Sequence, residues 1–323
     1  MGGIGLKIRI TPLEMLAYSL ARELRDGEIA FVGQGHPIVA ACLAKKFFAP
    51  RLKILMEGGI YGSEPYRPPW HIADLTATKG CLMLTDFAGV FLSILSRGFV
   101  DVGIIGCSQI DKYGNINTTV VGDYFNPVLR LPGSGGGHEV GSFSKRLLIT
   151  MAGGRFVEKL DYVTTPGWLD GGDSREKAGL PGGPAALITK KGIFRFHPET
   201  KEMYLDARYP WVSVEEIKRE VPWDLKLAED GVKVAPLPSP EELKFIREFS
   251  PLTALRRDYY LMEKITEKHW MLEPSDEPLI TRIVEIRDEE REAIKKRIAM
   301  KREARGSFFK KEIGKWMGDS AKG

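Results

Sequence analysis

The sequence predicts an α/β fold in which an open, mainly parallel β-sheet is flanked by helices. Two observations support this prediction: short apolar runs alternate with helical patterns through the first half of the chain, and Gly or Pro bounds most of the runs. A charged, mainly helical extension is predicted at residues 251–323, so that the chain divides into a domain at 1–250 and this extension.

The first half predicts helices and strands in alternation. Thr11 precedes Pro12, and Glu14 stands three residues after Thr11, which is a capping box that begins a helix to about Arg25. Further helices are expected at 36–48 and 86–97, and strands at 29–32, 52–56 and 100–105. This βαβ order is typical of a parallel, doubly wound sheet.

The second half is richer in predicted strands. Apolar runs at 146–150 and 162–164 predict two strands, and the runs at 186–189 and 193–196 predict a hairpin. Ser213 and Ser239 each begin a predicted helix. In the extension, an apolar stripe follows one face of a charged helix, and it consists of Ile283, Ile286, Ile294 and Ile298. The stripe fits a solvated helix or a disordered tail, or a face that packs on the partner subunit or on a neighbouring copy.

Charge and cysteine content narrow the function classes. The formal net charge is +4, and residues 285–323 account for all of it, with 12 Lys and Arg against 8 Asp and Glu. The remainder is neutral, so no nucleic-acid surface is expected. The three cysteines stand far apart, which predicts no metal site and a reducing compartment. Without a signal peptide or an apolar run of ~18 residues, a cytoplasmic protein and no membrane contact are expected.

Glu57 is the first candidate for chemistry. It ends the apolar run at 52–56 and is followed by Gly58 and Gly59. In open α/β sheets ligands bind at the carboxyl ends of strands, and Gly lets a ligand approach the backbone closely. The carboxylate is therefore a candidate nucleophile or base. The alternative is a Glu that leaves its strand into solvent.

Two glycine-rich loops are candidates for binding. Gly33-Gln34-Gly35 joins a strand to a helix, but Ile38 replaces the third glycine of a dinucleotide fingerprint, so no nicotinamide cofactor is expected. Its amides either line a ligand crevice or only form the turn. A second loop exposes amides that could hold an oxyanion, unless it is only a flexible surface loop; its glycines are Gly133, Gly135, Gly136 and Gly137.

The segment between these loops follows the strand at 100–105. Gln109 and Asp111 are therefore expected near the same sheet edge as Glu57. The alternative for Asp111 and Asn115 is that they only hydrogen-bond the turn at 113–115. His138, beside the second loop, has no neighbouring Cys or Ser in sequence and is a weak candidate for a base.

Together these motifs resemble the class I CoA transferases, and most closely the B subunits of the glutaconate CoA-transferase type. The resemblance covers about residues 10–250. Its motifs, in family order, are Glu57-Gly58-Gly59, Gln109 to Asn117, Gly122-Asp123-Tyr124, Gly133 to Gly136, Asp161 to Gly171 and Gly179 to Gly182.

The resemblance implies a two-subunit enzyme that moves CoA from an acyl-CoA to a carboxylic acid, which can be a dicarboxylic acid. Glu57 matches the family glutamate that forms an acyl anhydride and then a glutamyl-CoA thioester. Gly135 and Gly136 match the oxyanion loop, and Gly33, Gly35, Gln109, Gly133 and Gly137 are expected to contact substrate or CoA. An A-type subunit is the expected partner, and coenzyme A is expected as a substrate, with no tightly bound cofactor.

One residue departs from the family pattern, because Gly58 stands where glutaconate-type subunits commonly have Ser. The identity of the acid therefore stays open. A CoA-ester or ring-opening hydrolase of the same fold, in which water attacks, is the alternative enzyme. A ligand-binding module without turnover is the alternative from another class. Glu57 favours transfer, because the resemblance implies that such hydrolases lack this glutamate in the corresponding subunit.

Overall fold

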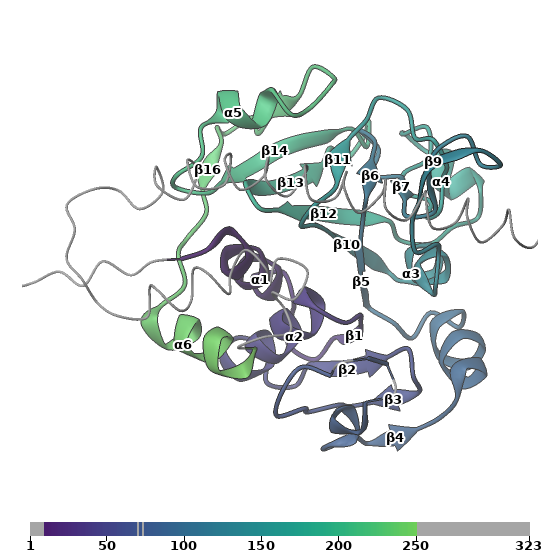
Figure 1. Ribbon diagram of the computed structural model, residues 1–323, viewed down its shortest axis with the longest axis vertical. Helices are drawn as coiled ribbons and strands as arrows, with labels where there is room; N and C mark the ends of the chain where they lie inside the picture. Colours follow the sequence, from purple (N-terminus) through teal and green to yellow (C-terminus); the bar gives the residue numbers. More distant parts are fainter. Residues whose placement is uncertain (1–9, 70, 73, 251–323) are drawn as a thin grey trace, which may run out of the picture. The chain divides into compact units, whose positions relative to one another are not determined.

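The computed structural model describes residues 10–69, 71–72 and 74–250, which Figure 1 draws in colour. The predicted extension at 251–323, with its isoleucine stripe, lies outside the described residues. Within them the chain forms an α/β fold with a mixed, mainly parallel sheet and helices on both faces, as the sequence predicts.

The main sheet has eleven strands among the described residues, in the order β15-β14-β13-β12-β10-β5-β1-β2-β3-β4, and β16 also pairs with β14. Its centre, from β12 to β2, is parallel. Antiparallel pairs flank this centre on both sides. The strands are β1 (Ile29–Val32), β2 (Lys53–Met56), β3 (Ile60–Tyr61), β4 (Met83–Leu84), β5 (Val102–Gly106), β10 (Arg146–Met151), β12 (Pro184–Thr189), β13 (Gly192–Phe196), β14 (Met203–Arg208), β15 (Lys226–Leu227) and β16 (Lys233–Val234).

Two small sheets lie beside the main one. A three-stranded sheet contains β6 (Gln109–Ile110), β7 (Ile116–Asn117) and β11 (Arg155–Phe156), and a hairpin pairs β8 (Val120–Gly122) with β9 (Pro127–Arg130). The helices are α1 (Pro12–Arg22), α2 (His36–Phe47), the 3-10 helix η1 (Leu75–Thr78), the π-helix η2 (Gly89–Leu95), α3 (Gly137–Phe143), α4 (Ser174–Lys177), α5 (Val214–Lys218) and α6 (Pro240–Phe249).

Helices α1, α2 and α6 form one layer against the sheet. The predicted capping box is present in α1, where the Glu14 N–H donates to Thr11 Oγ1 and the Thr11 N–H donates to Glu14 Oε2. Residues 37–44 of α2 are all buried, because α1, α6 and β1 all pack against this helix. Arg247 of α6 also pairs with Glu14, which attaches the last described helix to the first.

Helices α3 and η2 contact each other, and α3 packs on β5. Figure 1 shows them apart from the α1–α2–α6 layer. The core between the layers is apolar and fully buried along the central strands, as in Leu147, Leu148 and Ile149 of β10. Burial of this kind supplies most of the stabilisation of such a domain.

Two predicted elements differ from the structure. The strand expected at 162–164 is a bend, and only Thr165 makes an isolated bridge, to Ile116. The helix expected at 86–97 is a π-helix from Gly89 to Leu95. At 162–164 a contact with a distant segment sets the backbone, because the Thr164 N–H donates to the carbonyl oxygen of Ile116. A local apolar run carries no information about such a contact.

Candidate active site

Glu57 lies directly after β2, at the carboxyl end of that strand. Residues 54–56 are buried, whereas Glu57 is half-buried. The Gly59 N–H donates to the carbonyl oxygen of Met56 at 3.1 Å and closes a tight turn. This hydrogen bond to the last residue of β2 fixes the backbone at Glu57.

Both glycines after Glu57 are required by close neighbours. An added Cβ on Gly58 would overlap the carbonyl oxygen of Ile72, and one on Gly59 would overlap that of Thr85. Gly59 also has φ +94°, a backbone conformation that favours glycine. In this chain the Ile72 carbonyl oxygen lies where a side chain at position 58 would begin, which agrees with Gly in place of Ser.

The sheet register brings Gly33 next to Glu57. Phe31 of β1 pairs with Leu55 of β2 on one side and with Gly103 of β5 on the other. The same register carried two residues forward places Gly33 beside Glu57, and adjacent strands lie about 4.8 Å apart. The chain leaves β1 toward β2 and later returns to β5 on the opposite side of β1. Such a switch point is where open α/β sheets bind ligands.

The Gly33–Gly35 loop is open. Gly35 is the N-cap of α2 with φ +81°, and neither Gly33 nor Gly35 would bring an added Cβ within 4 Å of another atom. The loop therefore leaves free space at the sheet edge that carries Glu57.

The second glycine loop reaches the Glu57 carboxylate. A Cβ added to Gly136 would lie 3.3 Å from Glu57 Oε1 and 2.5 Å from Cζ of Phe91. In the part of the chain that the structure describes, the amides of Gly135 and Gly136 make no hydrogen bond. Gly135 has φ +50° and open space around it. Among the described residues, the two amides that the sequence assigned to an oxyanion are thus not bonded within the chain, and Gly136 borders the carboxylate.

The other two glycines of this loop use their amides within the chain. The Gly133 N–H donates to the carbonyl oxygen of Thr118, and Thr118 Oγ1 donates back to the Gly133 carbonyl, both at 2.8 Å. The Gly137 N–H donates to the Ser134 carbonyl at 2.9 Å. These bonds anchor the loop, and a contact of either residue with CoA stays a prediction.

Gln109 is buried in a polar network. Its Nε2 donates to Asp161 Oδ2 at 2.7 Å, and its Oε1 accepts from Asn117 Nδ2 at 2.6 Å. The hydrogen bond from Gln109 lowers the pKa of Asp161. With 1% of its surface exposed, Gln109 holds neighbouring loops together, and its predicted contact with substrate stays a prediction.

Asp111 and Asn115 hydrogen-bond the turn, which is the alternative that the sequence left open. Asp111 Oδ1 accepts from the backbone N–H groups of Tyr113 and Asn115, both at 2.9 Å. Burial raises the pKa of Asp111, although these hydrogen bonds act in the opposite direction. Asn115 Oδ1 also accepts from the Gly167 N–H at 2.8 Å, which attaches the turn to the segment that precedes α4.

Two residues near the loop carried no signal in the sequence. Phe91 lies beside Gly136 but belongs to a predicted helix in which an apolar residue is ordinary. Among the described residues, Arg175 is 1% exposed and donates only to backbone carbonyls, those of Gly141, Ser142, Pro166, Gly167 and Pro181.

His138, the weak candidate base, has its Nδ1 3.3 Å from the carbonyl oxygen of Thr164.

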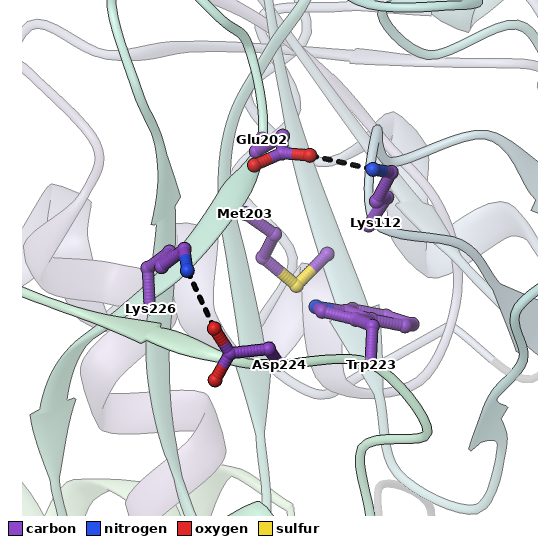
Figure 2. Close-up of a pocket in the computed structure, with 6 residues that line it drawn as sticks. All are labelled: Lys112, Glu202, Met203, Trp223, Asp224 and Lys226. Carbon is purple, nitrogen blue, oxygen red and sulfur yellow. Dashed lines mark hydrogen bonds and ion pairs between the residues drawn. The ribbon is translucent and has the colours of Figure 1, made fainter.

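A separate cavity of about 150 Å³ lies between β14, β15 and the turn after β6. Figure 2 shows its two ion pairs, Lys112 with Glu202 and Lys226 with Asp224, around Met203 and Trp223. None of the predicted site residues lines it.

Within residues 10–250, apart from 70 and 73, no cluster of three His, Cys, Asp or Glu is placed to hold a metal ion. No described helix is long and apolar enough to cross a membrane.

Comparison with known proteins gives consistent matches. A family model described as Coenzyme A transferase matches residues 13–220. The B subunit of glutaconate CoA-transferase from Acidaminococcus fermentans is 38% identical over 245 residues, covering 74% of this chain and 91% of that protein. The B subunit of 3-oxoadipate CoA-transferase from Pseudomonas knackmussii is 36% identical over 244 residues, covering 75% and 94%.

A solved structure agrees with these sequence matches. The crystal structure of glutaconate coenzyme A-transferase from Acidaminococcus fermentans superposes with a TM-score of 0.69 and 34% identity, over 75% of this chain and 96% of that chain. Taken with the matched residues and the strand-end glutamate, this shows that the chain belongs to the coenzyme A transferase family.

Proposed function

We propose that this chain is the B-type subunit of a two-subunit CoA transferase and that Glu57 is its nucleophile. The observation that carries the proposal is the position of Glu57 Oε1, 3.3 Å from the place of a Cβ on Gly136. A carboxylate nucleophile and unoccupied amides then share one sheet edge. Covalent acyl transfer needs both parts.

The reaction proceeds through two kinds of covalent bond to Glu57, an anhydride and a CoA thioester. The carboxylate attacks the thioester carbonyl of the acyl-CoA, and CoA thiolate leaves to give a mixed anhydride. The thiolate then attacks the Glu57 carbonyl carbon, which releases the donor acid and leaves a glutamyl-CoA thioester. The acceptor carboxylate attacks this thioester and expels CoA thiolate, which gives a second mixed anhydride. The thiolate then attacks the acceptor's acyl carbon and expels the Glu57 carboxylate. The products are the new acyl-CoA and free Glu57.

The glycine loop supplies the electrostatic part of the reaction. Each step passes through a tetrahedral oxyanion, which amide donors stabilise. Gly135 and Gly136 take this role because their amides are free among the described residues and Gly136 borders the carboxylate. Gly33 and Gly35, at the end of β1, line the side of the crevice where CoA enters, and Gln109, Gly133 and Gly137 support the loops around it.

The partner is an A-type subunit. The chain covers more than nine tenths of two relatives that are named as B subunits. Acyl-CoA and a carboxylic acid are the substrates, so coenzyme A enters and leaves as part of a substrate.

Substitution of Glu57 tests the proposal. We expect Glu57→Ala and Glu57→Gln, assembled with the partner, to lose CoA transfer between two acids while keeping the wild-type mass of the complex. Glu57→Asp withdraws the carboxylate by about 1.5 Å, and a displacement of about 1 Å costs ~100-fold in rate. Full transfer by Glu57→Ala would contradict the assignment. Release of free CoA and acid without any acceptor would indicate a hydrolase instead.

A further inference from the structure

We propose that Phe91, with Phe87 stacked on it, selects the acid, and that the preferred acid is a monocarboxylic acid with an aryl or branched alkyl group one carbon away from its carboxyl. This inference rests on the proposed function, because it names the substrate of the same site. It follows from the side chains that border the Glu57 carboxylate.

The ring of Phe91 stands beside the nucleophilic oxygen. One point, the place of a Cβ on Gly136, lies 2.5 Å from Phe91 Cζ and 3.3 Å from Glu57 Oε1, so these two atoms are at most 5.8 Å apart. In the anhydride the acyl carbon is bonded to a Glu57 oxygen, and its substituent begins one bond further. A substituent of a few carbon atoms that extends toward the ring therefore contacts its edge.

The orientation of Phe91 is set by two other rings. Its centroid lies 5.8 Å from that of the buried Phe31 on β1, and 6.3 Å from that of Phe87, whose ring is inclined by only 6°. Phe87 is 50% exposed. The pair therefore extends from beside the carboxylate to the protein surface, which forms an apolar wall long enough for a phenyl or isobutyl group.

The π-helix explains how Phe91 reaches this position. Residues 89–95 form η2, and an added Cβ on Gly89 would overlap Thr85 Oγ1, so this approach of the helix needs glycine. Single π-helical turns are rare and are frequent at functional sites. Asp86, just before the helix, accepts from the Gly89 N–H at 2.7 Å.

Polar recognition from position 58 is excluded on this side of Glu57. The carbonyl oxygen of Ile72 occupies the space of any side chain at Gly58. A hydroxyl that could bind a polar substituent of the acid therefore has no place there. Apolar contact with Phe91 is the interaction that this surface offers to the acyl group.

The test compares four acceptor acids with the assembled two-subunit enzyme: phenylacetate, 3-methylbutyrate, acetate and glutarate. We expect the wild-type kcat/KM to be higher for the first two. Phe91→Ala should lower kcat/KM for phenylacetate by about 10- to 100-fold and leave acetate within about threefold. Phe87→Ala should give a smaller loss with the same selectivity. Phe125→Ala, at a 91% exposed ring on the β8–β9 hairpin, is the matched control and should change neither.

Each other outcome contradicts the inference in a distinct way. An equal loss for phenylacetate and acetate means that Phe91 only supports the fold. Loss of the wild-type mass in Phe87→Ala means that the rings contact the partner subunit. A wild-type preference for glutarate contradicts the proposed substrate class but leaves the proposed transferase activity intact. Failure to transfer CoA to any acid, glutaconate and 3-oxoadipate included, contradicts the proposed function and this inference with it.

Discussion

At the scale of single residues, the site depends on glycines that let other groups approach. Gly58 and Gly59 accommodate two carbonyl oxygens against the turn after Glu57, and Gly136 leaves room between Glu57 and Phe91. A side chain at any of the three would displace its neighbours. Glu57 itself needs no unusual backbone geometry, because it directly follows the buried strand β2.

Gly136 and Gly135 provide a matched pair for the oxyanion. Gly136→Val pushes on Phe91 and Glu57 and so displaces the amide from its place beside the carboxylate. We expect kcat to fall by ~100- to 1,000-fold, as when one donor is lost, with a smaller change in KM. Gly135→Ala meets no atom and keeps its amide, at a cost of about 1 kcal/mol in stability for its positive φ. Steady-state kinetics of both variants checks this. Wild-type turnover in a folded Gly136→Val would make the loop a surface turn.

Gly33→Ala tests the crevice at the end of β1. The new methyl meets nothing within 4 Å and the backbone has no positive φ, so the free energy of unfolding should change by no more than about 0.5 kcal/mol. If CoA enters beside Gly33, the KM for acyl-CoA should rise several-fold. Gly35→Ala, with φ +81°, should also lose about 1 kcal/mol of stability. An unchanged KM in Gly33→Ala would place CoA elsewhere.

At the scale of elements, α3 presents the glycine loop and is held at both ends. Thr118 binds Gly133 before the helix, and Arg175 donates to the carbonyl oxygens of Gly141 and Ser142 in its last turn. No carboxylate of the described residues pairs with Arg175, and burial lowers the pKa of Arg175 to about 10. Carbonyl oxygens alone therefore stabilise this charge.

Arg175→Lys should show how much α3 depends on that guanidinium. Lys offers three donors at one point, whereas Arg offers five in a planar fork, so several carbonyls lose their partner. We expect the free energy of unfolding to fall by about 2–4 kcal/mol, measured by urea denaturation. Because α3 carries Gly136, kcat should also fall in the folded fraction, while Lys177→Ala, at an exposed α4 side chain, should change neither. Wild-type stability of Arg175→Lys would contradict this account of α3.

Local signals predicted the parts of the site that are set by local chain geometry. A strand that stops at a Gly pair predicted the strand-end position of Glu57, and a run of glycines predicted the second loop, because both patterns follow from backbone rules. The catalytic roles of these residues stay predictions. Phe91 and Arg175 were not predicted, since their roles arise only when segments far apart in the chain pack together. The bend at 162–164 was predicted as a strand for the same reason: its apolar residues carry no information about their partners.

At the scale of the whole molecule, membership of the coenzyme A transferase family accounts for the sheet and the position of the site. The family model ends at residue 220, and the relatives align over about 245 residues. Helix α6 completes the described fold by packing on α2 and pairing with α1.

The partner requirement has a direct test. We expect the chain expressed alone to be folded but inactive, and co-expression with its A-type partner to give a larger complex that transfers CoA. Because α6 ends at Phe249, a truncation after Ser250 should keep the fold and, with the partner, the transfer activity. Mass measurement and a transfer assay distinguish the forms. A fully active lone chain would overturn the two-subunit proposal, and loss of assembly on truncation would assign the partner contact to residues 251–323.

The central claim is that Glu57 becomes covalently linked to CoA during turnover. The most direct measurement is to incubate the assembled enzyme with an acyl-CoA, reduce the thioester with borohydride, and locate the modified residue by peptide mass mapping. The account predicts reduction at Glu57, in proportion to loss of activity, and no reduction when acyl-CoA is omitted. Modification at another residue, or none while the enzyme turns over, would contradict it.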